Sequence, residues 1–205
     1  MRLRYTFLFA LISILVITSC KESTDKEVAD SDLEVDIEEV VPEEPAEKKP
    51  PSVESLRRSN SVMARLMSNG DCKTFASYVV SAELSEVLLN GEGPITVFAP
   101  SDAAIAALGE ETTKDLLNSE SKALMSSAVR THVVEGNYDS VTITQALKQG
   151  RVNLTSLSGE KLSVTRSGNN IYITDSKGNK AKVGKSDING TNGVVHVVDA
   201  FLGLD

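Results

Sequence analysis

The order of hydrophobic patterns along this chain restricts it to one class of fold. From Val53 to about residue 150, apolar residues recur mainly with helical spacing, and two β-rich runs, Ile95–Phe98 and His132–Val134, interrupt them. After residue 150, short β-branched runs alternate with turn clusters such as Gly168-Asn169-Asn170. Helical segments followed by an antiparallel meander predict an α+β fold.

Turn and cap residues set the expected limits of these elements. Asn69-Gly70 ends the first helix, Asp71 is expected to cap the second, and Thr112 with Asp115 has capping-box spacing. The predicted helices are 56–68, 72–80, 84–88, 103–108, 112–117, 121–130 and 141–147. The predicted strands are 95–98, 132–134, 152–155, 162–165, 171–174 and 194–198.

The net charge of −8 equals that of one stretch before the domain. Residues 21–51 hold 12 acidic and 4 basic residues, which accounts for −8, and they end in prolines at positions 42, 45, 50 and 51. Such a segment cannot bury enough apolar area to offset its ordering entropy. We therefore expect a disordered tether over 20–52 and one domain over 53–205. No basic patch with interleaved aromatic residues appears, so nucleic acid is not an expected partner.

The N-terminus predicts export and lipid anchoring. Arg2 and Arg4 precede an apolar run that is too short for a membrane span, and Ile17-Thr18-Ser19-Cys20 follows it. This arrangement resembles a bacterial lipobox, with residues 1–19 as signal peptide and Cys20 as the acylated first residue. Several acyl chains would hold the protein stably in a lipid bilayer. Lys21 stands where an aspartate favours inner-membrane retention, so we expect the outer membrane, with the cell surface as a further expectation.

Few side chains in the domain are candidates for chemistry. The histidines, His132 and His196, both fall in apolar runs where imidazoles satisfy buried groups, and no His, Cys or carboxylate spacing fits a metal site. Cys72 lies in an apolar helical stripe and is expected to be buried, with a reactive thiol as the alternative. A Ser101–His132–Asp102 set lacks a nucleophile-elbow motif. We expect no catalytic residues, no metal and no cofactor.

Three blocks of sequence resemble a fasciclin (FAS1) domain. They are Thr96–Ile105, which includes Pro100 and Asp102, then His132–Gly136, and finally Asn192–Asp199, which includes His196. Their order and spacing also match the family, over roughly residues 59–204. The resemblance implies a wedge of two β-sheets flanked by helices. Together with the lipobox, it predicts a FAS1-domain lipoprotein of bacterial, Bacteroidetes-like type.

The resemblance also implies roles for the residues of these blocks. Asp102 and His132 are expected to approach each other and fasten the first block to the central strand. Thr96, Pro100, His196 and Asp199 are expected to be structural, with interaction as the other possibility. The family commonly has a tyrosine before the central histidine, in a segment linked to integrin contact in animal adhesion proteins. Thr131 stands there, which argues against integrin contact.

The expected function is a membrane-tethered, non-enzymatic adhesion or protein-interaction module of the bacterial envelope. Its partner would be an envelope or extracellular protein or a polysaccharide. The alternatives are a carrier or sensor of a small apolar or carbohydrate ligand in a cleft, and a structural envelope protein. Asp139-Ser140-Val141 also resembles a short Bacteroidetes O-glycosylation motif, which makes Ser140 a candidate acceptor.

Overall fold

A computed structural model of the chain describes residues 50–91 and 93–204. The predicted signal peptide, Cys20 and almost all of the predicted tether lie outside these residues. The helices are α1 (Val53–Ser59), α2 (Val62–Ser68), α3 (Lys73–Ser81), α4 (Ser85–Asn90), α5 (Asp102–Ala106), α6 (Glu110–Leu117), α7 (Lys122–Thr131), α8 (Ser140–Lys148) and the 3₁₀ turn η1 (Ser119–Ser121). The strands are β1 (Ile95–Pro100), β2 (Val133–Glu135), β3 (Val152–Thr155), β4 (Lys161–Ser167), β5 (Asn170–Thr174), β6 (Lys180–Lys182), β7 (Ile188–Gly190) and β8 (Gly193–Val198).

These strands form two four-stranded sheets, which confirms the predicted α+β class. The first sheet has the order β2-β1-β8-β7, with β1 antiparallel to β2 and parallel to β8. The second is the predicted antiparallel meander, β3-β4-β5-β6. Isolated bridges join Val134 to Ser156 and Val183 to Val198, so the two sheets meet at these edges.

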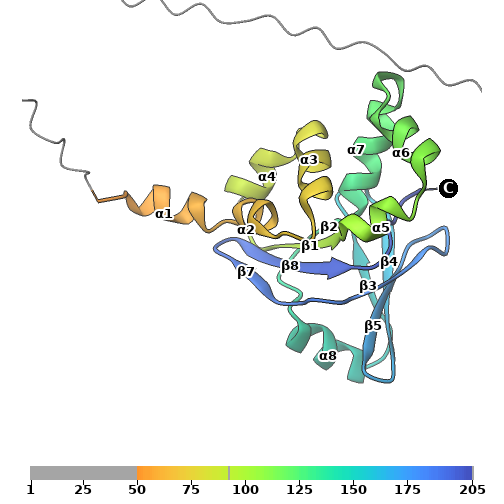
Figure 1. Ribbon diagram of the computed structural model, residues 1–205. Helices are drawn as coiled ribbons and strands as arrows, with labels where there is room; N and C mark the ends of the chain where they lie inside the picture. Colours follow the sequence, from red (N-terminus) through yellow and green to blue (C-terminus); the bar gives the residue numbers. More distant parts are fainter. Residues whose placement is uncertain (1–49, 92, 205) are drawn as a thin grey trace, which may run out of the picture. The chain divides into compact units, whose positions relative to one another are not determined.

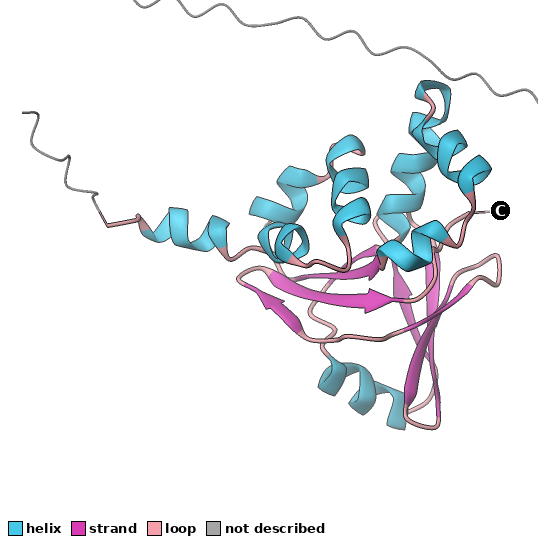
Figure 2. Ribbon diagram, in the orientation of Figure 1, coloured by secondary structure: helices cyan, strands magenta, loops and turns pink. Residues whose placement is uncertain are grey.

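The first sheet is buried on both faces because a separate core packs against each. Along β1, Ile95, Val97 and Ala99 belong to the core shared with α2, α3 and α7, whereas Phe98 belongs to the core shared with the second sheet and α8. Helices α2 to α7 lie on one side of this sheet and α8 on the other (Figure 1, Figure 2). Burial on both faces explains why β1 is a continuous apolar run rather than an alternating one.

Two helix predictions differ from the structure in where a helix begins. The segment that was expected to be one helix from residue 56 to 68 is two, because Ser61 interrupts it and accepts a hydrogen bond from the Ala64 N–H as the N-cap of α2. The expected capping box at Thr112 is wrong. Helix α6 begins at Glu110, after Gly109 at φ 84°, so Thr112 lies inside the helix.

Two short strands have no counterpart in the prediction. Strand β6 is Lys180-Ala181-Lys182 and strand β7 is Ile188-Asn189-Gly190, each with a single apolar side chain. Such segments lack the alternation by which a strand is recognised in a sequence. Within residues 50–91 and 93–204, no helix is both long and apolar enough to cross a membrane.

Candidate functional site

The three sequence blocks come together as neighbouring strands of the first sheet. Strand β1 carries the first block, β2 the second and β8 the third, with β1 in the middle. Phe98 is level with His196 across β1 and β8, and the Phe98 N–H donates to the His132 carbonyl at 2.9 Å. A Cβ on Gly193 would lie 1.9 Å from the Ile95 carbonyl oxygen, so only glycine fits there.

His132 ends a helix and does not lie in a strand, contrary to the prediction. It is the C-cap of α7, in right-handed helical conformation, and β2 begins one residue later. Its side chain is fully buried between the rings of Phe75 and Phe201, with centroid distances of 5.2 and 4.6 Å. The β-branched residues that follow it gave the sequence a strand-like pattern, but the helix extends to Thr131.

Both ring nitrogens of His132 bond to the backbone. The Leu202 N–H donates to Nε2 at 3.0 Å, so Nε2 carries no proton and Nδ1–H donates to the Ala128 carbonyl at 2.9 Å. Burial lowers the pKa of His132 to about 4 because desolvation opposes the charged ring. The histidine is therefore a neutral link between α7 and the C-terminal segment.

His196 makes the same kind of link with the opposite tautomer. Its Nε2 lies 2.8 Å from the Tyr138 carbonyl oxygen and donates to it, while Nδ1 accepts the Asp187 N–H at 3.4 Å. The ring stacks on Phe98 at 5.6 Å, and burial lowers its pKa. Each histidine therefore joins segments that are distant in sequence, which is a structural role.

The predicted pair of Asp102 and His132 is not formed. Asp102 Oδ1 accepts the Thr74 N–H at 2.8 Å, so this carboxylate caps α3 from the start of α5. The predicted cap, Asp71, instead accepts the Asp102 N–H at 2.7 Å through its backbone carbonyl. Cys72 occupies the N-cap position and makes no side-chain cap bond. Ser101 Oγ caps its own helix, so Ser101, Asp102 and His132 have separate partners.

The other block residues also bond within the fold. Thr96 is buried, and its hydroxyl donates to the Gly136 carbonyl and accepts the Tyr138 N–H. Pro100 ends β1, where it is buried opposite Val198. Asp199 is exposed and accepts the Lys182 N–H at 2.6 Å, which ties the end of β8 to β6.

Thr131, at the position of the family tyrosine, faces the interior. It is 1% exposed, and its hydroxyl lies 2.9 Å from Ser158 Oγ and 3.1 Å from Glu160 Oε2. The dipeptide Thr131-His132 is therefore not accessible to a partner while the domain is folded.

The cysteine of the described residues is buried and protonated. Cys72 is fully buried, as predicted, and burial raises the pKa of its thiol to about 11, so it stays protonated. Among the residues that the structure describes, no three His, Cys, Asp or Glu side chains gather in a way that could hold a metal ion.

Ser140 begins α8 and is hydrogen-bonded on both its backbone and its side chain. Its N–H donates to Asp187 Oδ1 at 2.8 Å, and its hydroxyl makes a short bond to Asp187 Oδ2. A sugar on this hydroxyl would have to replace the bond to Asp187. Ser140 is thus a candidate acceptor in the unfolded chain rather than in the folded domain.

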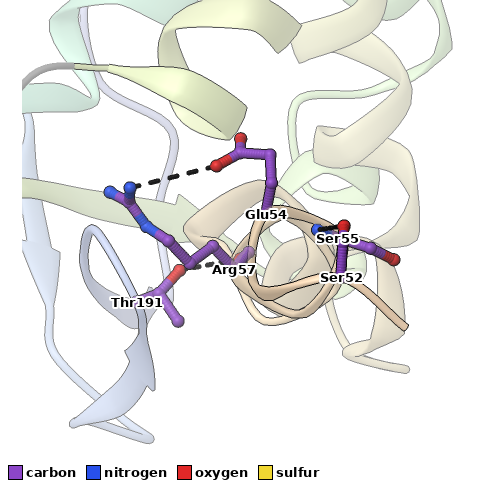
Figure 3. Close-up of polar contacts among 5 residues, drawn as sticks. All are labelled: Ser52, Glu54, Ser55, Arg57 and Thr191. Carbon is purple, nitrogen blue, oxygen red and sulfur yellow. Dashed lines mark hydrogen bonds and ion pairs between the residues drawn. The ribbon is translucent and has the colours of Figure 1, made fainter. Parts of the chain in front are cut away.

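A large concave surface lies beside the β7–β8 hairpin. A hollow of about 710 Å³, open to solvent, is lined by Arg57, Gly91, Gly93, Pro94, Asn137 and residues 189–193. The Thr191 hydroxyl donates to the Arg57 carbonyl at 2.9 Å, and Glu54 lies 4.0 Å from the Arg57 guanidinium (Figure 3). Asn192 is already bonded to Val62 N–H and the Leu88 carbonyl. The side chains of Arg57, Asn137 and Asn189 also line the hollow.

Comparisons with known proteins agree with this architecture. The family model of the Fasciclin domain matches residues 70–204. Protein sll1483 of Synechocystis sp. is 34% identical over 153 residues, which cover 74% of this chain and 79% of that protein. Stabilin-2 of Rattus norvegicus is 37% identical over 117 residues, 56% of this chain and 7% of its own length.

Two further similarities concern animal proteins. The transforming growth factor-beta-induced protein ig-h3 of Sus scrofa is 31% identical over 142 residues, 69% of this chain and 19% of its own length. A solved FAS1 domain pair from the insect cell adhesion molecule Fasciclin I matches with a TM-score of 0.54 and 21% identity, over 66% of this chain and 46% of that one. This structural likeness shows the fold. The chain thus spans a small part of the animal proteins that it resembles.

Proposed function

Since the chain belongs to the fasciclin family, we propose that it is a non-enzymatic interaction module, tethered to a bacterial cell envelope and adhesive toward a protein or polysaccharide. The fold match includes a domain pair from an insect cell adhesion molecule. One fold can host many functions, so the likeness in fold is not enough by itself to propose adhesion. The geometry of the site is the second argument for it.

One observation carries the proposal. The three family blocks meet in the interior, where both histidines bond to backbone groups and both are fully buried. These residues support the fold and leave no group free for acid–base or nucleophilic chemistry. A partner must therefore be recognised by the outer surface.

Anchoring through Cys20 follows from the sequence of the first 20 residues. We expect the mature chain to begin at Cys20 with acyl chains attached, and the acidic segment after it to act as a spacer. Mass spectrometry of the mature N-terminus tests this. An unmodified first residue or an intact signal peptide would refute the anchor.

The location that we propose is the outer membrane, on the basis of Lys21 after the lipidated cysteine. Lys21-Glu22 also resembles the basic-plus-acidic surface-export signal of Bacteroidetes lipoproteins, so we propose the outer face. Protease treatment of intact cells should remove the domain. Complete protection would place it on the periplasmic side.

Adhesion itself is tested with cells that carry the full chain. These cells should attach to each other or to a coated surface more than cells that lack the chain. Cys20→Ala cells should lose this attachment because the protein is no longer held at the surface. Equal attachment by all three strains would contradict the adhesive function.

The size of the hollow beside Arg57 favours a carrier as the second candidate. A volume of about 710 Å³ is in the range of small-molecule sites. Calorimetric titration of the full chain with neutral oligosaccharides, and with an apolar dye, tests this function. A carrier requires saturable binding that Arg57→Ala weakens, and no binding of either probe would exclude a ligand of these two classes.

A further inference from the structure

A second hollow, far smaller than the first, is lined by three basic side chains. It has a volume of about 290 Å³ and lies where α8 packs against β3 and β4. Lys148 comes from the last turn of α8, Arg151 from the residue before β3, and Arg166 from β4. The other lining residues are Thr144, Leu147, Gly150, Val164 and Thr165.

No carboxylate compensates these charges. None of the three cations has an ion-pair partner within residues 50–91 and 93–204, and Arg166 Nε donates only to the Gly168 carbonyl. Residues 140–174 hold four basic residues and one acidic residue, Glu160, in a chain of net charge −8. Glu160 is engaged with Thr131 and Ser176 instead.

Three like charges around one hollow repel each other, and this repulsion is relieved when an anion binds. The guanidinium groups of Arg151 and Arg166 can each bind a carboxylate or sulfate through two parallel hydrogen bonds. Lys148 adds a point charge at the exposed end of its helix. The charge arrangement therefore selects a ligand with oxyanion groups.

The uncharged part of the lining fits a sugar ring. The half-buried Thr144 and Thr165 offer hydroxyl groups to sugar hydroxyls, while the half-buried Leu147 provides apolar surface for ring carbons. No aromatic side chain lines the hollow, so it lacks the platform on which nucleic acid bases stack. Its concave shape and small size suit one or two ring units better than a lipid surface.

None of the residues that line the hollow belongs to the three family blocks. Helix α8 lies on the opposite side of the first sheet from helices α2 to α7 (Figure 1). Lys148, Arg151 and Arg166 are all exposed, so a long chain could run across them. From the charge, shape and position of this hollow, we infer that Lys148, Arg151 and Arg166 form a binding site for an acidic polysaccharide, one with carboxylate or sulfate groups. This inference rests on the proposed function and names the class of its partner.

The test uses the full chain in detergent micelles and measures binding by calorimetry to oligoalginate and to dextran sulfate, with neutral dextran alongside. We expect saturable binding to at least one anionic polymer, none to neutral dextran, and an affinity that falls as salt rises because the charges are exposed. The triple change Lys148→Gln, Arg151→Gln and Arg166→Gln should weaken binding at least tenfold. All three side chains are exposed, so the urea midpoint should stay unchanged.

A matched control distinguishes binding at the hollow from nonspecific attraction between the polymer and the positive charges of the protein. The triple change Arg58→Gln, Lys73→Gln and Lys185→Gln removes the same charge at exposed positions outside the hollow. It should leave the affinity within about twofold of wild type, since these three side chains do not line the hollow and exposed charges are screened by salt. Equal loss in both triple variants would overturn the site. So would the absence of binding to either anionic polymer.

Two further measurements complete the test. Vesicle binding distinguishes a lipid headgroup from a polysaccharide as the ligand, and cell attachment distinguishes failure of the site from failure of the adhesive function. Binding to phosphatidylglycerol vesicles without binding to either polymer would assign the hollow to a lipid headgroup and overturn the inference. Cell attachment is measured in parallel with both triple variants. If attachment persists while the hollow variant binds polymer normally, the site fails and the adhesive function stands. If polymer binding depends on the hollow but cells never attach, the adhesive function fails instead.

Discussion

The Nε2 atom of His132 accepts the backbone N–H of Leu202 at 3.0 Å, across 70 residues of sequence. With the Nδ1 bond to Ala128, this contact holds the end of α7 against the C-terminal segment. Replacing His132 with alanine removes a packed ring and leaves two buried backbone groups without partners. We expect His132→Ala to lower the free energy of unfolding by about 3 kcal/mol.

Urea denaturation followed by circular dichroism measures this loss. Leu124→Ala is the matched control, because Leu124 lies on the same helix but is 46% exposed. It should change stability by less than about 1 kcal/mol. If His132→Ala unfolds like wild type, the link to Leu202 does not stabilise the domain.

Acid should destabilise the domain through the same residue. The folded-state pKa of about 4 lies below the ordinary value of 6.5, so the unfolded chain binds more protons between these two pH values. The stability contributed by neutral His132 is therefore complete above pH 6.5, falls as the pH drops toward 4, and totals about 3 kcal/mol. His196 shifts in the same direction and adds to the loss.

Urea midpoints at several pH values test this prediction. Asp139 and Asp175 have lowered pKa values, so protonation of their carboxylates acts below the histidine range. A wild-type midpoint that is constant from pH 7 to pH 5 would show that the histidines titrate alike in the folded and unfolded chain.

The cap of α3 provides a comparison between two aspartates. Asp102→Ala should cost about 1 kcal/mol because Thr74 loses its acceptor, the usual size of a helix-cap effect. Asp71→Ala should change stability by less than about 0.5 kcal/mol, since Asp71 contributes its backbone carbonyl. Thermal unfolding of both variants measures these changes in stability. A larger loss of stability for Asp71→Ala would favour Asp71 as the cap, as the sequence predicted.

Thr131→Tyr tests the position at which this chain departs from its family. Thr131 is 1% exposed, and a Cβ on Gly203 would already lie 3.0 Å from its hydroxyl. A tyrosine ring there should overpack the interior and cost about 2 kcal/mol. Thr131→Ser, which keeps the hydroxyl, should cost less. A stable Thr131→Tyr protein would show that this position is open to the surface.

Local patterns predicted the elements of this fold but not their long-range partners. The meander, strand β1 and the buried stripe around Cys72 follow from spacing alone. The parallel pairing of β1 with β8 joins residues almost 100 positions apart, and no local pattern encodes it. Asp102 looked like a partner for His132 because both belong to family blocks, whereas its carboxylate caps the neighbouring helix.

The basic hollow was missed for a related reason. The acidity of residues 21–51 dominates the overall composition, and the basic residues of the domain are not interleaved with aromatic ones. Lys148, Arg151 and Arg166 come from three elements, so they are dispersed in the sequence. A charge count over residues 140–174, with four bases and one acid, is the signal that would have found them.

The central claim is that the family blocks form an inner framework and that recognition belongs to the surface. Long-range ¹H–¹⁵N correlation spectra of the full chain, labelled at histidine, test it most directly. The structure predicts two neutral rings, with the proton on Nδ1 in His132 and on Nε2 in His196, unchanged from pH 8 to pH 6 and on addition of oligoalginate. A ring that titrates near pH 6.5, or shifts when polymer binds, would contradict the claim and place that histidine at a functional site.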